Sequence, residues 1–149
     1  MRYLPLLRRL LPGLWAGALL AVALVATPAP FALLAPADAG RVVSRILAHE
    51  AYLSLALGVV LLALERLAAR STDTDTDEPG PTFSPGLLLA LGALFCTVAG
   101  YFALQPMMAA AQAGQGPLSF GQLHALSAAF YLVKTGLVAA LAWRAARQS

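Results

Sequence analysis

Four long apolar runs constrain this chain more than any other feature of its sequence. They cover about residues 10–27, 46–64, 85–104 and 121–142, and a helix needs roughly 20 apolar residues to cross a bilayer core. Because backbone groups in lipid have no water to bind, each run must satisfy its own hydrogen bonds as a helix. The sequence therefore predicts an all-α, polytopic membrane protein, a four-transmembrane-helix bundle forming one membrane domain over residues 1–149.

The composition supports this class and excludes others. Hydrophobic residues make up 60% of the 149 and charged residues 11%, whereas a soluble domain usually carries about 25% charged residues. A soluble domain, a disordered chain and a nucleic-acid module are excluded on this ground. The single cysteine, Cys96, lies within an apolar run and cannot form an internal disulfide.

Basic residues are distributed unevenly between the two ends of the expected bundle. An excess of Lys and Arg marks the cytoplasmic side of a membrane protein. With the N-terminus inside, the outer side carries only Arg41 and Arg45, and Lys134 lies within a span. The inner side then carries Arg2, Arg8, Arg9, Arg66, Arg70, Arg144 and Arg147. We therefore expect a multi-pass inner-membrane protein with both termini in the cytoplasm.

The N-terminal run allows a second interpretation. Arg8-Arg9 followed by an apolar stretch resembles a secretory signal peptide. The apolar stretch is long for such a peptide, however, and we expect it to remain as the first span.

Prolines and turn residues mark the expected ends of the spans. Pro28 and Pro30 are expected to close the first span, and Gln105-Pro106 to stop the third. Ser84-Pro85 combines a helix-capping residue with a proline suited to the first helical position. The third span is therefore expected to begin at this pair.

Two connections have readable sequences. Pro36 and Asp38 suit the first turn of a helix that leads into the second span. The polar, acidic segment at about 71–83 predicts a flexible cytoplasmic linker. Its alternating aspartates have the spacing that opens a calcium-binding loop, but the glycine and glutamate that such a loop needs are missing.

Small residues recur at four-residue spacing in every span. Such rows let helix backbones approach closely in lipid, where the hydrophobic effect does not drive association. We expect them to pack within the bundle, and self-association through the first row is the alternative. The rows are Gly13/Gly17/Ala21, Ser54/Gly58, Gly92/Cys96/Gly100 and Gly121/Ala125/Ala129.

The fourth span carries a polar face. His124, Ser127, Tyr131 and Lys134 fall within about 80° of one another on a helix. Ionisable residues inside a membrane are costly and usually face a bundle interior or a cavity. We expect Lys134 to face inward, and the alternative is that its chain extends to the inner membrane surface.

More polar residues are expected at the depth of His124, near the outer ends of the second and third spans: His49, Glu50 and Gln105. Together they suit a hydrogen-bonded network that fixes the helices, and they also suit proton exchange, ion binding or haem ligation. Two histidines without a third ligand are weak evidence for a metal, so we expect none. No catalytic motif is present, and we expect no enzyme activity.

Several segments resemble a bacterial membrane family catalogued as domain of unknown function 4149, which is similar to the eukaryotic transmembrane protein 205 group. The resemblance lies in residues 26–34, in residues 37–41, in the end of the third span and in Phe120-Gly-Gln-Leu-His-Ala-Leu-Ser. Ala125 stands where the family usually has glycine, and Tyr131 where asparagine is common. The resemblance implies four spans, no established reaction, and these motif residues: Pro28, Phe31, Gly40, Pro106, His124 and Ser127.

The expected function is that of a structural, interaction or accessory subunit of the inner membrane. The alternative is an oligomeric transporter or channel for ions or small molecules that uses the polar stripe of the fourth span. A third hypothesis is a haem or metal redox protein that uses His124. The expected partners are membrane lipids, a second copy or another membrane protein, with no nucleic acid.

Overall fold

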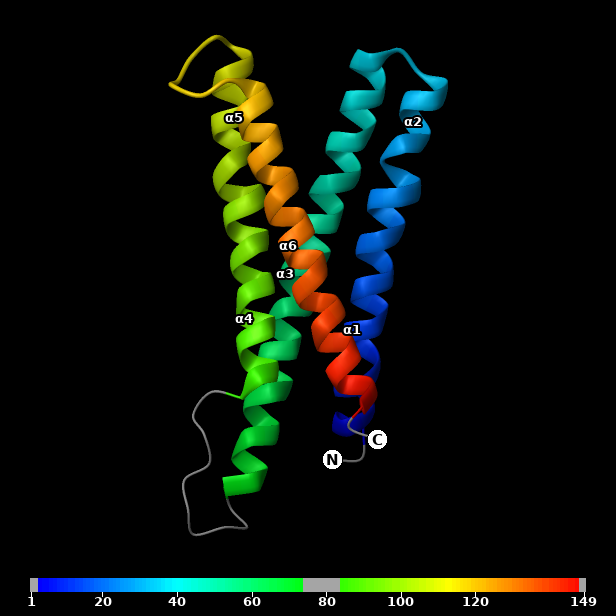
Figure 1. The fold of residues 1–149 in the computed structure, drawn as a ribbon, viewed down its shortest axis with the longest axis vertical. Helices are drawn as coiled ribbons and strands as arrows, with labels where there is room; N and C mark the ends of the chain where they lie inside the picture. The colour runs from blue at the N-terminus through cyan, green and yellow to red at the C-terminus, as the bar shows by residue number, and fades with distance from the viewer. Residues whose placement is uncertain (1–2, 74–83, 148–149) are drawn as a thin grey trace.

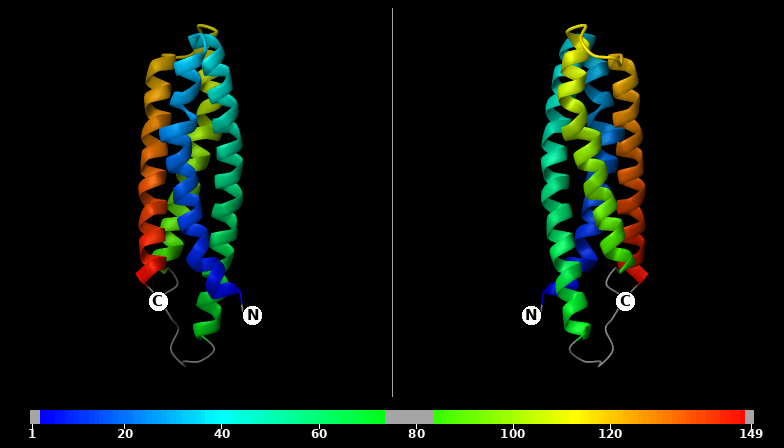
Figure 2. Two further views of the ribbon diagram at one scale, coloured as in Figure 1. Left: turned by 90° about the vertical axis from the view of Figure 1, so that its right-hand side faces the viewer. Right: turned by 90° about the vertical axis from the view of Figure 1, so that its left-hand side faces the viewer.

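The computed structural model describes residues 3–73 and 84–147, with side chains for 3–69 and 84–147. Four helical segments are long and apolar enough to cross a membrane: Leu4–Leu33, Pro36–Ala69, Pro85–Gln112 and Phe120–Arg147. They lie side by side in an elongated bundle, and no strand occurs in the described ranges (Figures 1 and 2). The predicted four-helix membrane architecture is confirmed.

Apolar side chains cover the outside of the bundle. Leu14, Leu24, Leu33 and Leu132 are each more than two-thirds exposed, at 68%, 72%, 86% and 71%. Such a surface is unusual for a soluble monomer, because large exposed apolar patches promote association. It suits a protein whose outer surface faces lipid.

The sequence analysis predicted that the first span ends at Pro28, but the first segment continues beyond it. It consists of α1 (Leu4–Ala21), the π-helical η1 (Val22–Ala26) and α2 (Pro28–Leu33). In η1 the wider turn lets the Thr27 amide donate to the Val22 carbonyl at 2.9 Å. Pro28 then occupies the first position of α2, where a missing N–H costs little. The π-helical turn therefore carries the helix past the proline.

The third segment repeats this arrangement, so the predicted stop at Gln105-Pro106 is also wrong. It consists of α4 (Pro85–Thr97), the π-helical η2 (Val98–Ala103) and α5 (Leu104–Gln112). Pro106 is the third residue of α5 and so lies in its first turn, shortly after the π-helical residues. A first-turn position again tolerates the missing amide.

The predicted starts of two helices are confirmed. α3 (Pro36–Asp73) begins at Pro36 with Asp38 in its first turn, and the Ser84 hydroxyl accepts a hydrogen bond from the Leu87 amide at 3.1 Å. α3 includes the first three residues of the predicted linker 71–83. The rest of that linker lies outside the described residues.

α6 (Phe120–Arg147) begins at a reciprocal cap. The Ser119 amide donates to the Gln122 side chain at 3.0 Å, and the Gln122 amide donates to the Ser119 hydroxyl at 3.2 Å. This pair satisfies amides that the first turn of a helix leaves unbonded. In the turn before it, Gly114 and Gly116 have φ angles of 73° and 96°, which favour glycine.

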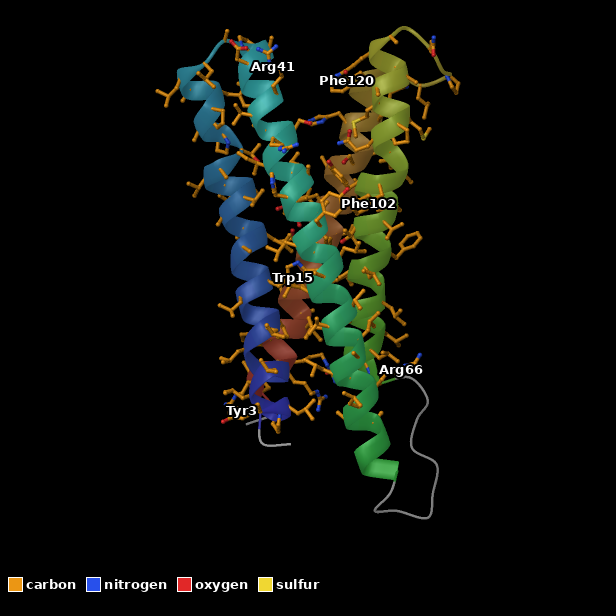
Figure 3. All side chains as sticks on the ribbon, turned by 180° about the vertical axis from the view of Figure 1, so that it is seen from behind. Tyr3, Trp15, Arg41, Arg66, Phe102 and Phe120 are labelled. Carbon is orange, nitrogen blue, oxygen red and sulfur yellow. The ribbon has the colours of Figure 1, made fainter. Side chains whose placement is uncertain are left out.

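The two ends of the bundle differ. Both termini lie at one end, here called the terminal end, and the α2–α3 and α5–α6 connections lie at the other, the loop end (Figure 1). At the loop end the bundle divides into two arms: the end of the first segment and the start of α3 form one, and the end of the third segment and the start of α6 form the other (Figure 1). Arg41 lies on the first arm and Phe120 on the second, while Tyr3 and Arg66 lie toward the terminal end (Figure 3). The helices are therefore packed around a core toward the terminal end and separate toward the loop end.

The core of the terminal half joins all four helical segments. Trp15 points into the bundle, and its side chain is fully buried (Figure 3). The other buried members are Leu19, Leu61, Leu64, Ala90, Ala93, Val138 and Leu141.

Candidate functional site

A buried ion pair lies at the level where the two arms separate. Lys134, near the middle of α6, is 3% exposed, and its Nζ lies 2.7 Å from Oε1 of Glu50 on α3. The ammonium therefore points into the bundle and does not extend to the membrane surface. A desolvated charge is costly unless it is paired and hydrogen-bonded, and this pairing meets that cost for both groups.

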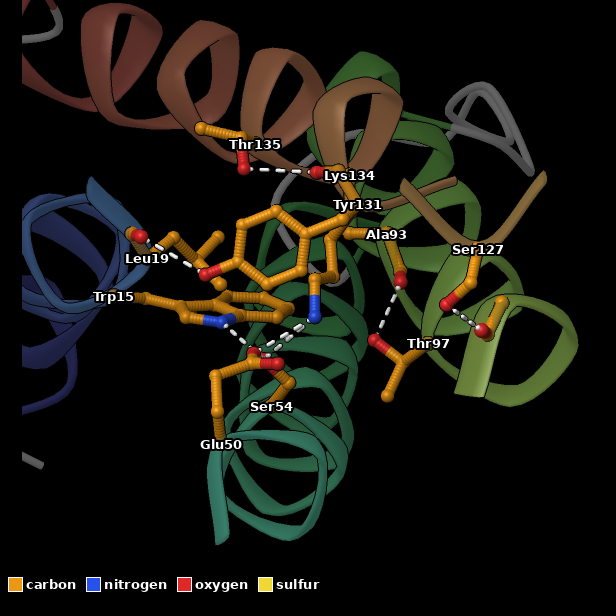
Figure 4. A network of polar contacts seen from close by, with 11 residues as sticks. Trp15, Leu19, Glu50, Ser54, Ala93, Thr97, Ser127, Tyr131, Lys134 and Thr135 are labelled. Carbon is orange, nitrogen blue, oxygen red and sulfur yellow. Dashed lines mark hydrogen bonds and ion pairs between the residues drawn. The ribbon is translucent and has the colours of Figure 1, made fainter. Parts of the chain in front are cut away.

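Ser54 and Trp15 complete the network around this pair (Figure 4). Ser54 lies one helical turn after Glu50 and donates its hydroxyl proton to the Glu50 carboxylate. The Trp15 indole N–H donates to Ser54 Oγ at 2.8 Å, so α1 is joined to α3 at this point. Lys134 Nζ also lies 4.7 Å from the centre of the Tyr131 ring, a cation–π contact.

Two further side chains of α6 bond to the backbones of neighbouring helices. The Tyr131 hydroxyl donates to the Leu19 carbonyl at 2.8 Å, and the Ser127 hydroxyl donates to the Gly100 carbonyl at 2.7 Å. Gly100 lies in η2, and Leu19 lies one turn before η1. The polar face predicted for α6 therefore joins this helix to η2 and to the last turn of α1 (Figure 4).

A cavity of about 940 Å³ extends from the loop end to the ion pair. Arg41 and Phe120 line it at the loop end, and Glu50 and Lys134 line it at the middle of the bundle. Its walls come from η1, α2 and α3 on one arm and from α4, η2, α5 and α6 on the other. The ion pair thus forms the polar floor of a cavity with mixed apolar and polar walls.

This cavity is lined by most, but not all, of the site residues predicted from the sequence. Eight of its lining residues were predicted as network or family-motif positions, whereas the predicted His49, Pro28 and Pro106 do not line it. His49 is exposed, and its Nδ1 lies 2.8 Å from the Arg45 carbonyl of its own helix. The predicted residues that line the cavity beside Lys134 and Glu50 are Phe31, Gly40, Gln105, His124, Ser127 and Tyr131.

His124 does not join the hydrogen-bonded network that the sequence analysis expected at its depth. Its ring stacks on Phe120, with the centroids 5.9 Å apart, and it makes no hydrogen bond to Glu50 or Gln105 in the described part of the chain. Glu50 is engaged instead by Lys134, which lies nearly three helical turns after His124 on α6. His124 therefore belongs to the mouth of the cavity, and not to the network at its floor.

Sequence reasoning missed Trp15 and treated Ser54 only as a small packing residue. The signal available for Ser54 was its position four residues after Glu50, which places the two on one helix face. Nothing in the sequence of the first span pairs Trp15 with the second span. Cys96 and Thr97 also line the cavity, and their inward direction follows from packing that a single sequence does not reveal.

The cavity offers few ligands for a metal ion. Among the described residues, no group of three or more His, Cys, Asp and Glu side chains lies close enough to hold one. His124 lines the cavity and His49 does not, so the two histidines do not face a common central site.

Comparison with known proteins gives one match. Residues 10–117 match the family described as Domain of unknown function (DUF4149). The matched range includes Pro28, Phe31, Gly40 and Pro106, and it ends before His124 and Ser127. Neither a curated protein nor a solved structure matches the chain significantly.

Proposed function

The chain belongs to the family described as Domain of unknown function (DUF4149), and from the cavity it contains we propose that it is a ligand-binding membrane protein. The proposed ligand is a small amphipathic molecule. Its apolar part lies between the two arms, and its polar group lies against Lys134 and Glu50. The cavity supports the alternative that uses the polar stripe of α6, and the proposal concerns ligand binding rather than a purely structural role.

The observation that carries the proposal is the ion pair at the floor of the cavity. Burying two charges costs about as much as their attraction returns, so such a pair contributes little net stability. Ionisable groups within membrane spans commonly mark substrate or ion pathways. A bundle that served only as a scaffold would gain nothing from Lys134 and Glu50 that apolar side chains could not supply.

The walls favour an amphipathic ligand. Leu47, Val43 and Met108 contribute apolar surface, whereas Gln105 and Ser127 contribute hydrogen-bonding groups. Pockets for small molecules commonly combine a mainly apolar lining with a few polar groups that fix orientation. A fully hydrated ion would leave most of this wall unused.

The proposal includes an orientation in the inner membrane with both termini in the cytoplasm. It is supported by the arginine distribution, because Arg41 and Arg45 are the arginines that α3 carries near the loop end. The cavity then opens toward the outer side. In a Cys96→Ser background, an impermeant thiol reagent applied to intact cells should label Gln112→Cys and leave Thr76→Cys unlabelled; the reverse pattern would invert the orientation.

Ligand retention tests the binding function. Native mass spectrometry of the purified protein should show a small-molecule adduct, and the charge-balanced double variant Glu50→Gln/Lys134→Met should lose it. Arg66→Gln, which changes a charge outside the cavity, should keep the adduct. A wild-type protein without any adduct, or a double variant that retains it, would contradict the proposal.

An interaction or accessory role is the second candidate, and one observation favours it. A Cβ atom added at Gly13 or Gly17 would meet nothing within 4 Å, so this row of α1 is unoccupied within the monomer. Small-residue rows of this spacing bring membrane helices together. A second copy or another membrane protein is the proposed partner.

The proposal assigns the chain no catalytic residue, no cofactor and no nucleic-acid partner. The haem hypothesis depends on His124 and has its own test, the visible absorption spectrum of the purified protein. A Soret band that His124→Ala abolishes would replace the present proposal with a haem protein.

A further inference from the structure

A second pocket lies at the terminal end, away from the ion pair. It has a volume of about 470 Å³ and lies between the first residues of α1, the start of α4 and the end of α6. Three guanidinium groups line it, from Arg8, Arg9 and Arg144. Glu65 of α3 is its one acidic lining residue among those that the structure describes.

The charge of Glu65 is already compensated. Arg8 holds the carboxylate with both arms of its guanidinium, Nε to Oε1 at 3.0 Å and Nη2 to Oε2 at 3.1 Å. The Ser84 hydroxyl donates to Oε2 at 3.4 Å. The carboxylate also lies against the start of α4, since a Cβ added at Gly86 would be 2.7 Å from Oε2. Helix N-termini favour negative charge, so Glu65 is satisfied on several sides.

Arg9 and Arg144 have no such partner. Both are exposed, and neither forms a salt bridge or a hydrogen bond to a carboxylate in the described ranges. Their two positive charges therefore face a pocket whose one carboxylate is engaged elsewhere. Guanidinium groups bind phosphate oxygens in pairs of parallel hydrogen bonds, which makes arginine the usual residue for phosphate recognition.

From this arrangement we propose that the terminal-end pocket binds the phosphate group of an anionic amphiphile, with Arg9 and Arg144 as its ligands. Pro5, Leu6 and Leu141 line the same pocket, and Leu6 is 51% exposed. An acyl chain that follows this apolar wall would leave the phosphate between the two arginines. A membrane phospholipid supplies both the phosphate group and the acyl chain, whereas a soluble phosphate supplies only the phosphate group.

The test is a lipid titration of the purified protein followed by native mass spectrometry. Phosphatidylglycerol should bind about tenfold more tightly than phosphatidylcholine with the same acyl chains, because the quaternary ammonium of choline offsets the phosphate charge that attracts the arginines. A tenfold ratio corresponds to about 1.4 kcal/mol. The double variant Arg9→Gln/Arg144→Gln should lose that preference. Arg66→Gln removes a charge from α3 toward the same end, outside the pocket, and should keep the preference.

Two controls check that the double variant folds and that the bound phosphate group belongs to a lipid. Because Arg9 and Arg144 form no salt bridge in the described ranges, we expect the double variant to unfold at the wild-type temperature. Inorganic phosphate that stabilises the wild type, but not the double variant, in the absence of any lipid preference would assign the site to a soluble phosphate. An equal loss of lipid preference in Arg66→Gln, or equal binding of the two lipids, would overturn the proposal.

Discussion

The terminal half and the loop half of this bundle contain the same four helical segments but pack them differently. In the terminal half, Trp15, Leu61 and Val138 are at most 1% exposed and form a core shared by the segments. In the loop half, the arms separate (Figure 1). A cavity of about 940 Å³ lies between them. The Lys134–Glu50 pair lies at the boundary between the two halves.

The difference between the halves shows how a small membrane protein can combine a rigid, packed end with an end that contains a cavity. Without a hydrophobic effect between helices in lipid, close packing and hydrogen bonds must hold the bundle together. The terminal half provides the packing, and the network of Trp15, Ser54 and Tyr131 provides hydrogen bonds at the floor of the cavity. We infer that this base leaves the loop half free to accommodate a ligand.

The largest expected effect comes from removing one member of the Lys134–Glu50 pair, which lies at the boundary between the two halves. Lys134→Met leaves the Glu50 carboxylate without its ammonium partner, and breaking a buried pair in this way costs about 3–5 kcal/mol. The free energy of unfolding, followed through Trp fluorescence in mixed detergent, should fall by this order. The double variant Glu50→Gln/Lys134→Met should recover most of the loss. A Lys134→Met protein as stable as the wild type would show that the boundary does not depend on the pair.

A smaller effect should distinguish glycines that pack against a neighbouring helix from glycines that meet no neighbour. A Cβ at Gly100 would lie 2.4 Å from the Phe130 Cβ, so Gly100→Ala must push η2 away from α6 and should cost about 1–3 kcal/mol. Gly17→Ala meets no neighbour and should add up to about 1 kcal/mol through its better helix propensity. Both values come from the same unfolding measurement. A Gly17→Ala protein that is destabilised, or that loses a dimer, would place a partner on α1.

Trp15→Phe should have a modest effect on the network. It keeps most of the buried ring but removes the indole N–H that donates to Ser54, and a lost hydrogen bond of this kind costs about 1 kcal/mol. Thermal unfolding followed by circular dichroism measures the change. No change in melting temperature would mean that the bond to Ser54 does not help to join α1 to α3.

The smallest expected effect concerns the acidic linker. Replacing residues 74–81 with a Gly/Ser segment of equal length should change the free energy of unfolding by less than about 0.5 kcal/mol, because the polar, acidic composition offers little apolar surface to bury. Folded yield after size-exclusion chromatography checks it. A large loss would reveal a contact or a bound cation on this segment and reopen the calcium alternative.

The sequence was informative about the helices and less so about the site. Apolar length predicts four spans, and Ser84-Pro85 and Pro36 predict where two helices begin, because these signals are local. The effect of Pro28 was mispredicted because a π-helical turn has no comparable sequence signal. The polar face of α6 follows from helical periodicity alone.

The partners of that face could not be predicted in the same way. Lys134 pairs with Glu50 across 84 residues of sequence, and Trp15 reaches Ser54 across 39. Such pairs depend on how the helices rotate and cross, which a single sequence does not specify. The same limit explains why Glu50 was expected at the depth of His124, whereas it pairs with Lys134.

Cysteine accessibility along α6 tests most directly whether the loop half contains an open cavity above a closed base. Ala128 lines the cavity, Ala129 is exposed on a different face of the helix, and Val138 is fully buried in the base. Each is changed to cysteine in a Cys96→Ser background, and intact cells receive an impermeant methanethiosulfonate reagent, which reacts with thiolates in water. Ala128→Cys should be labelled, and Ala129→Cys and Val138→Cys should not. Equal labelling of the two neighbouring positions, or labelling of Val138→Cys, would contradict this prediction, as would an unreactive Ala128→Cys.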